Sequence, residues 1–207
     1  MTFNILNTSN KNITAFSLLV RLIYPDGTAG TREYGNDFLP FMAENQGNGA
    51  IVPGATFAID VPLGQQQIQT ASATVELVVY ADATADVLNE QAFASISAQR
   101  KGWILGYQKA NELIQKALAD SNDPHPSTTV AAQLKAQAKQ YETNPPAGGA
   151  YAALGLLDAA TNVSNSPKSP NGRSQKEDDF LRGLVKAHQS RISLSLPHTQ
   201  VTKGVRP

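Results

Sequence analysis

Three kinds of residue in this 207-residue chain could carry chemistry: histidines, grouped carboxylates, and one tryptophan beside basic residues. The histidines are His125, His188 and His198, and none is spaced with another ligand as a metal site on a helix or loop requires. His125 stands between two prolines, His188 has lysine and arginine neighbours, and His198 lies near the C-terminus. We therefore expect all three to be exposed to solvent.

Carboxylates occur in two patterns. Five aspartates in the first half could converge at one end of a domain and bind calcium, as loop carboxylates do in some extracellular modules: Asp26, Asp37, Asp60, Asp82 and Asp86. No spaced Asp-x-Asp loop accompanies them, so we predict no metal site. The run Glu177-Asp178-Asp179 is better explained by a helix start, where the helix dipole stabilises negative charge.

The signatures of most enzyme classes are missing. Cysteine is absent, which excludes disulfides, thiolate metal sites and cysteine nucleophiles. No Gly-x-Ser-x-Gly elbow and no glycine-rich phosphate loop occurs, and Gly47-Asn48-Gly49 is typical of a turn. We predict no catalytic residue and no cofactor.

Trp103 is the aromatic residue of most interest. It follows Arg100 and Lys101 and precedes Tyr107 on an expected helix. These four residues are our candidates for contact with a partner or ligand. The alternative is that Trp103 packs within the protein.

The first half of the chain is patterned as strands. Short apolar runs at 3–6, 13–24, 31–34, 56–61 and 73–81 are separated by Asn, Gly, Pro and Asp. The strongest run alternates with a period of two, as Phe16, Leu18 and Val20 show. No helix-length segment separates these runs, so we expect an antiparallel, immunoglobulin-like β-sandwich over residues 1–86.

The second half is patterned as helices. Apolar residues recur at three- and four-residue steps over 89–119, with Asn89 as a cap, and a second helix begins at Ser127 or Thr128 and reaches about 142. A third is expected over 150–163, although Gly155 weakens it, and a last one begins at Ser174. The fold class is therefore α+β, with a helical region over 87–196, a flexible linker at 164–173 and a loose tail at 197–207.

Charge is unevenly spread along the chain. Residues 1–86 hold three Lys and Arg against eight Asp and Glu, and residues 87–207 hold 14 against nine, so the net charges are −5 and +5. No dense basic face with interleaved aromatic residues is visible, which argues against a nucleic-acid partner. The longest apolar stretch, 16–24, is too short to span a membrane. Either the protein is cytoplasmic, or a signal segment is absent from this chain.

Several short segments resemble a sandwich domain of uncharacterised bacterial exported proteins. They are the residues around 7–16, Tyr24-Pro25-Asp26-Gly27, Pro53-Gly54 and the stretch 79–84, within about the first hundred residues. The resemblance implies a periplasmic or extracellular setting and a non-catalytic role. In such domains the last strand often ends in an Ala-Asp-Gly-Thr turn, whereas Ala83 stands here in place of the glycine, which does not favour a tight turn with positive φ.

These observations favour a structural or protein-interaction module, an accessory subunit of the bacterial envelope or extracellular space, that binds a protein partner or self-associates. The alternative is a small-ligand-binding protein or hydrolase with a cleft between sandwich and helices near Trp103.

Overall fold

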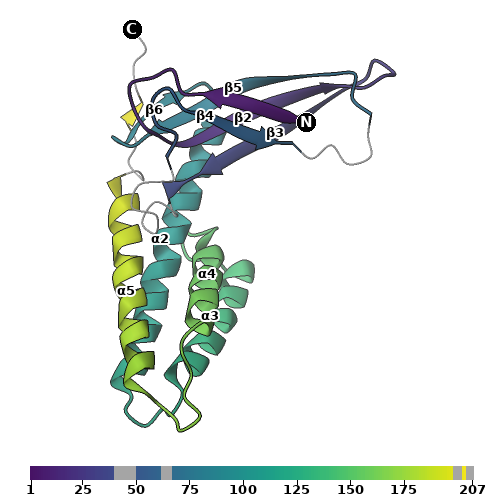
Figure 1. Cartoon of the computed structure of the whole chain (residues 1–207). Coiled ribbons are helices and arrows are strands. Elements are labelled where there is room, and N and C mark those ends of the chain that lie inside the picture. The colour runs from purple at the N-terminus through teal and green to yellow at the C-terminus, as the bar shows by residue number, and fades with distance from the viewer. Residues whose placement is uncertain (40–49, 62–66, 198–201, 204–207) are drawn as a thin grey trace. The chain divides into compact units, whose positions relative to one another are not determined.

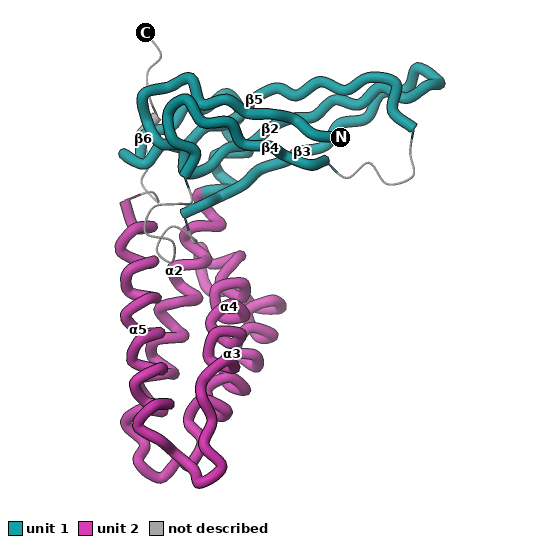
Figure 2. Tube along the Cα trace, in the orientation of Figure 1, with its two compact units in different colours: residues 1–96, 200–207 teal, residues 97–199 magenta. Residues whose placement is uncertain are grey.

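A computed structural model describes residues 1–39, 50–61, 67–197 and 202–203 (Figure 1). The chain forms two compact units, Met1–Ile96 with Gln200–Pro207 (unit 1) and Ser97–Thr199 (unit 2) (Figure 2). Unit 1 contains the sheets and unit 2 the helical region, so the expected α+β class is confirmed. The predicted turn at 47–49, His198 and most of the predicted tail lie outside the described residues.

The strands of unit 1 form a two-stranded and a five-stranded sheet, with the orders β1-β4 and β3-β2-β5-β6-β7. All neighbours are antiparallel except β6 and β7, which are parallel. The five predicted strands are present, β3 and β5 are longer than predicted, and β6 and β7 were not predicted. Their bounds are β1 Thr2–Leu6, β2 Ile13–Ile23, β3 Ala29–Asp37, β4 Thr56–Asp60, β5 Thr70–Tyr80, β6 Thr84–Val87 and β7 Thr202–Lys203.

β2 has a strand partner on each side, β3 and β5, and most of its side chains are buried. On one face Phe16 and Leu18 are at most 3% exposed, and they share an apolar cluster with Ile5 of β1 and Phe57 of β4. Side chains from both sheets therefore pack together. This cluster is the main core of unit 1.

The opposite face of the five-stranded sheet is covered by the start of a helix. Ala15, Leu77 and Val79 are fully buried and cluster with Ala92 and the partly buried Phe93. Both covering residues belong to the first turns of α2 (Glu90–Ala119). Unit 1 therefore extends to residue 96, whereas the sequence pattern placed its end at 86.

The turn between β5 and β6 has a tight positive-φ conformation although no glycine is present. Ala83 has a φ of 62°, and it is the one non-glycine residue with positive φ in the described part of the chain. Asp82 stabilises this turn by accepting hydrogen bonds from the Thr84 amide (3.1 Å) and hydroxyl (2.6 Å). It also forms an ion pair with Lys11 (2.7 Å). The hydrogen bonds from Lys11 and Thr84 lower the pKa of Asp82 to about 2.

We expect Ala83→Gly to raise the free energy of unfolding by about 0.5–1 kcal/mol, because alanine is strained at positive φ and glycine is not. Urea denaturation measures this change. Ala81→Gly, at an exposed neighbouring position without positive φ, is the control and should be destabilising. Equal effects of the two substitutions would show that the turn stores no strain.

Four helices lie in the described part of the chain: α2, α3 (Pro126–Thr143), α4 (Ala152–Ser164) and α5 (Gln175–Ser195). Each contributes a fully buried residue to one apolar core in unit 2, namely Ile114, Leu134, Leu156 and Leu181. None of these helices is both long and apolar enough to cross a lipid bilayer.

The helix starts agree only in part with the predicted caps. Asn89 caps α2 as predicted, because its side chain accepts a hydrogen bond from the Gln91 amide (2.9 Å). The prediction that Ser127 or Thr128 caps α3 is wrong: His125 is the N-cap, since Pro126 occupies the first helical position.

Ser174 caps α5 as predicted and accepts a hydrogen bond from the Glu177 amide (3.3 Å). The Glu177 side chain does not complete a capping box, because it instead accepts hydrogen bonds from the Ser127 amide (3.0 Å) and hydroxyl. This buried carboxylate therefore links α5 to the start of α3.

The segment predicted as a linker ends in an anchored arginine. Arg173 donates a hydrogen bond to the Leu118 carbonyl (2.8 Å) in the last turn of α2 and forms an ion pair with Asp178 (2.9 Å). Carbonyls at a helix end lack partners within the helix, so this guanidinium satisfies them.

Glycines bring α2 and α4 into backbone contact. A Cβ atom at Gly106 would lie 2.5 Å from the Ala152 carbonyl oxygen, and one at Gly155 would lie 2.9 Å from the Trp103 carbonyl oxygen. Gly155 therefore lies within α4 for a packing reason that outweighs its low helix propensity.

We expect Gly106→Ala to lower the free energy of unfolding by about 2 kcal/mol, because the added methyl group meets backbone atoms that cannot move away easily. Gly183→Ala on α5 is the matched control. Nothing lies within 4 Å of its added Cβ, so it should be stabilising by about 1 kcal/mol. Thermal or urea denaturation measures whether the two substitutions change the free energy of unfolding in opposite directions. A stabilising Gly106→Ala would contradict the close contact.

Candidate functional site

The four residues expected at a contact surface all lie on α2 but at different depths. Arg100 and Tyr107 are buried, Trp103 is half-buried and Lys101 is exposed. They do not form one exposed surface. Lys101 lines a pocket of about 220 Å³ with mainly apolar neighbours, namely Ile104, Leu105, Ala147, Gly148 and Leu196.

Tyr107 belongs to a polar cluster that joins three helices. Its hydroxyl donates a hydrogen bond to Oδ2 of Asp158 on α4 (3.0 Å), and Arg191 on α5 donates hydrogen bonds to the same oxygen (2.8 Å) and to the Tyr107 hydroxyl. Asn162, one turn after Asp158, donates a further hydrogen bond to this oxygen (3.1 Å). One carboxylate oxygen therefore organises side chains from α2, α4 and α5.

His188 packs against the same tyrosine. The two rings are stacked with centroids 4.8 Å apart, and His188 Nδ1 lies 2.9 Å from the Asn111 side-chain oxygen. An amide oxygen only accepts hydrogen bonds, so Nδ1 carries a proton in this arrangement. His188 is 1% exposed, and our prediction that this histidine is exposed is wrong, whereas His125 is exposed as predicted.

Burial sets the charge states in this cluster. It lowers the pKa of His188 to about 4, so the imidazole is neutral at neutral pH. Burial and the Asp158 carboxylate together raise the pKa of Tyr107, which keeps its hydroxyl protonated. Burial also raises the pKa of Asp158, against the hydrogen bonds from Tyr107 and Asn162, which lower it.

The cluster contains acid and base side chains, but these groups bond mainly to one another. The Arg191–Asp158 ion pair has side-chain exposures of 5% and 32%, so the arginine is enclosed and the carboxylate is the more accessible partner. This arrangement determines which faces of three helices meet. We therefore assign it a role in helix packing.

The sequence contained a signal for part of this cluster. The buried residues of α5 follow helical spacing throughout: Glu177, Leu181, Val185, His188, Arg191 and Ser195. His188 and Arg191 therefore continue the apolar stripe that Leu181 and Val185 begin. Polar residues in line with an apolar stripe indicate buried polar contacts.

The five aspartates considered as calcium ligands each accept a hydrogen bond from a different residue. Asp26 accepts hydrogen bonds from Thr28, Asp37 from Leu39, Asp60 from Thr2, Asp82 from Thr84 and Asp86 from Tyr80. Among the described residues there is no group of three His, Cys, Asp or Glu side chains that could hold a metal ion. The five carboxylates therefore do not converge.

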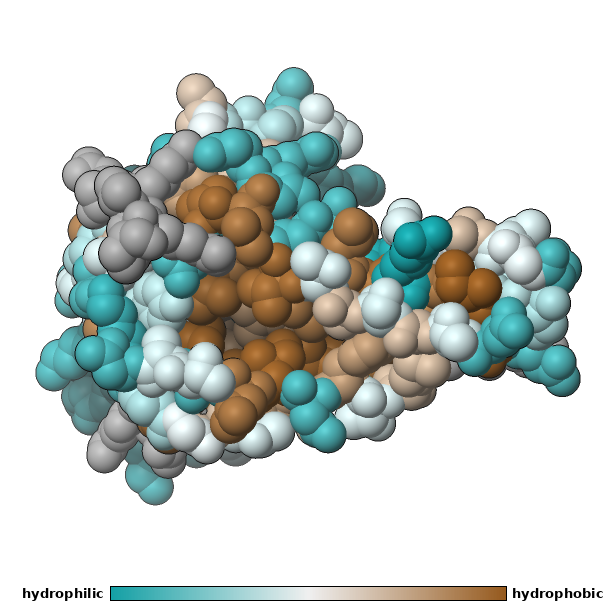
Figure 3. Space-filling model, turned by 90° about the horizontal axis from the view of Figure 1, so that it is seen from above, coloured by the Kyte–Doolittle hydropathy of each residue, from teal (hydrophilic) through white to brown (hydrophobic). Residues whose placement is uncertain are grey.

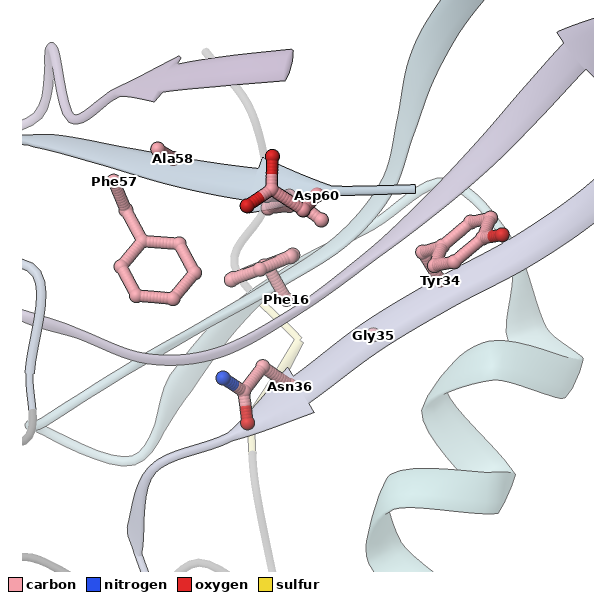
Figure 4. A pocket seen from close by; sticks show the side chains of 8 residues that line it. Phe16, Tyr34, Gly35, Asn36, Phe57, Ala58 and Asp60 are labelled. Carbon is pink, nitrogen blue, oxygen red and sulfur yellow. The ribbon is translucent and has the colours of Figure 1, made fainter. Parts of the chain in front are cut away.

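A different site opens on the side of unit 1 between β3 and β4. A pocket of about 210 Å³ lies there, with Phe16, Phe57 and Ile59 as its apolar part and Asn36 and Asp60 among its polar residues. Figure 4 shows the Phe57 ring and the Asn36 side chain approaching it from opposite strands, with Phe16 between them. The Phe16 and Phe57 rings meet edge to face, with centroids 5.9 Å apart, which fixes the pocket floor.

Both strands beside this pocket have an open edge. β3 pairs with β2 and β4 with β1, and neither has a second partner among the described residues. Met1 and Val61 exchange hydrogen bonds across the β1–β4 ladder, so by alternation Ala58 directs its N–H and C=O away from β1. The Phe38 amide bonds to Thr14, and the same alternation turns the backbone of Gly35 away from β2.

No family model, curated protein or solved structure matches this chain.

The functional assignment therefore depends on geometry. The Tyr107 cluster uses its polar groups internally, whereas the β3–β4 opening presents an apolar pocket beside two strand edges that have no second strand partner in the described part of the chain. Unpaired strand edges are the usual template for pairing with another chain. The β3–β4 opening is the stronger candidate for a binding site.

Proposed function

We propose that this chain is a non-catalytic protein-interaction module. Unit 1 is an immunoglobulin-like β-sandwich in this proposal, and the β3–β4 opening receives an extended segment of a protein partner. The observation that carries the proposal is the pair of open strand edges beside an apolar pocket. A bound segment would pair with the β4 edge and place alternate side chains toward the pocket, as in β-strand addition.

The size of the pocket favours a peptide side chain over a free small molecule. Its volume of about 210 Å³ is below the roughly 300–1,000 Å³ of typical small-molecule sites. The apolar floor of Phe16, Phe57 and Ile59 suits one aliphatic or aromatic side chain. The backbone pairing would then supply affinity along the rest of the segment.

The charge around the opening favours a basic segment. Residues 1–86 carry a net charge of −5, and the exposed Asp60 of β4 lines the pocket. Complementary charge speeds association and discriminates against wrong partners. The preferred partner segment therefore alternates apolar and basic residues.

Amide chemical shifts of the isotope-labelled full chain test this proposal directly. The probe is a synthetic seven-residue peptide of alternating lysine and valine, blocked at both ends. We expect saturable shifts at the amides of Gly35 and Ala58, on the two strands beside the pocket. No saturable shift at either amide would contradict the β3–β4 opening as the site.

Two variants at one position separate edge pairing from simple charge attraction. Ala58→Pro removes the open-edge N–H without removing a β1–β4 hydrogen bond, and proline is tolerated on edge strands. It should abolish the peptide-induced shift at Gly35, while the control Ala58→Ser should retain it. Equal binding of the peptide by both variants would show that charge attraction alone accounts for binding, and would contradict strand pairing.

A periplasmic or extracellular setting stays a prediction from the family resemblance. The same holds for a role as an accessory subunit. Fractionation of the source cells with an antibody against the chain would test the compartment.

A further inference from the structure

A second opening in unit 1 lies on the side of β5, away from β3. β5 pairs with β2 along its length, but on its other side β6 covers only Leu77–Val79. Thr70–Val75 therefore has no strand partner on that side among the described residues. β1 likewise pairs only with β4 in this part of the chain.

The surface at this second opening is apolar. Val75 is 40% exposed and Ala73 is also exposed, although both pair across the ladder with the buried residues Leu18 and Val20 of β2. β5 is the uppermost strand in Figure 1, and Figure 3, which looks down on this side of unit 1, shows a hollowed apolar area. The inner face of β5 is therefore less covered than that of β2.

The open segment of β5 lacks the residues that normally prevent strand edges from pairing. Residues 67–75 read Gln-Ile-Gln-Thr-Ala-Ser-Ala-Thr-Val, with no charge and no proline, and β1 is also uncharged along its side chains. Natural edge strands commonly carry lysine, proline or inward-pointing charges for protection. The β3–β4 side differs, since Arg32, Glu33 and Asp60 lie along its strands.

We propose that the Thr70–Val75 edge of β5 is a self-association surface occupied by the same edge of a second copy of this chain. An uncharged edge meets its own copy without repulsion, and the formal net charge of zero removes long-range repulsion between chains. A twofold interface presents the same patch from both copies. The uncharged β5 edge therefore fits a second copy of itself better than it fits a charged partner.

The pleat limits the register of this contact. Residues directly opposite each other in an antiparallel pair point to the same face, so the apolar inner faces match when each residue of the central pair meets its own copy. We place Ala73 at that position, because the exposed Val75 then lies opposite an apolar residue of the second copy. Ala71 of each copy then lies opposite Val75 of the other. The contact extends the five-stranded sheet across the dimer and joins the two apolar hollows.

Sedimentation velocity of the full chain over a range of concentrations measures the association. We expect a concentration-dependent species of twice the 22.1 kDa chain mass. Ala73→Lys and Ala73→Glu each place like charges directly opposite one another, so each should raise the dimer dissociation constant at least about tenfold. An equimolar mixture of these two variants should restore the dimer, because the opposed charges are then complementary.

Ala58→Lys, on β4 beside the other opening, is the control and should dimerise like the original chain. A chain that stays monomeric up to its solubility limit overturns the proposal, as does a dimer that survives both Ala73 substitutions. Failure of the mixture to dimerise overturns the register at Ala73. Because the lysine–valine peptide reports on Gly35 and Ala58, failure here leaves the proposed function separately testable.

Discussion

Replacing Asp158 with asparagine is expected to lower the free energy of unfolding of unit 2 by about 3 kcal/mol. The substitution keeps the shape of the side chain but leaves the Arg191 guanidinium, 5% exposed, without its carboxylate. Removing one partner of a buried ion pair typically costs about 3–5 kcal/mol, and the partial exposure of Asp158 favours the lower end. Trp103 is the one tryptophan in the chain and lies in unit 2, so its fluorescence during urea denaturation reports this loss.

Asp179→Asn is the matched control, because Asp179 forms an ion pair with Arg182 at the surface (3.0 Å; exposures 61% and 51%). Exposed pairs contribute about 0–1 kcal/mol, so this variant should change little. Combining Asp158→Asn with Arg191→Met should recover part of the lost stability, because the buried guanidinium that has lost its carboxylate is then removed as well. A loss below 1 kcal/mol for Asp158→Asn alone would show that the pair does not hold α4 and α5 together.

The stability of unit 2 should fall by about 3 kcal/mol through His188 as the pH decreases from 6.5 to 4. The pKa of His188 is about 4 in the folded chain against an ordinary value of 6.5, with burial as the cause. Between these values the unfolded chain binds a proton at this residue and the folded chain does not, so acid favours unfolding. Below about pH 4 both states are protonated, and this contribution no longer changes.

A pH series of urea denaturations compares the original chain with His188→Gln, which cannot titrate at this position. The difference between the two chains should shrink as the pH falls through this window, because only the original loses stability through His188. The charged and titratable groups around the imidazole are Tyr107 and, through it, Asp158 and Arg191. His125→Gln, at an exposed position, is the control, and a parallel pH dependence for His188→Gln and the original chain would refute this assignment.

Much of the fold could be predicted because local patterns and tertiary packing agree. The alternation in β2 and the three- and four-residue steps in α2 both continue over many residues, and such long patterns are the most reliable. β6 was missed because its turn depends on Ala83 in a conformation that favours glycine. The cap of α3 was misplaced because Glu177, 50 residues away, satisfies the Ser127 amide.

The candidate site was harder to predict because it depends on strand edges that have no neighbouring strand. Open edges at β3 and β4 follow from strand order, and a single sequence does not determine strand order. The Tyr107 cluster brings together α2, α4 and α5. Only Tyr107 among its members was predicted as a contact residue, and His188 was predicted to be exposed. Long-range contacts of this kind leave no local spacing in the sequence, except for the stripe on α5.

One face of the five-stranded sheet becomes covered late during synthesis on the ribosome. The residues that cover it, Ala92 and Phe93, follow the strand residues Ala15, Leu77 and Val79 in the chain. All strands through β6 leave the ribosome before the helical turn that closes one face of their sheet. Domains generally fold in N- to C-terminal order during synthesis, yet this sheet stays uncovered on that face until residue 96 has emerged. A nascent chain from which about 86 residues have emerged should therefore be a better chaperone substrate than one from which some ten more have emerged.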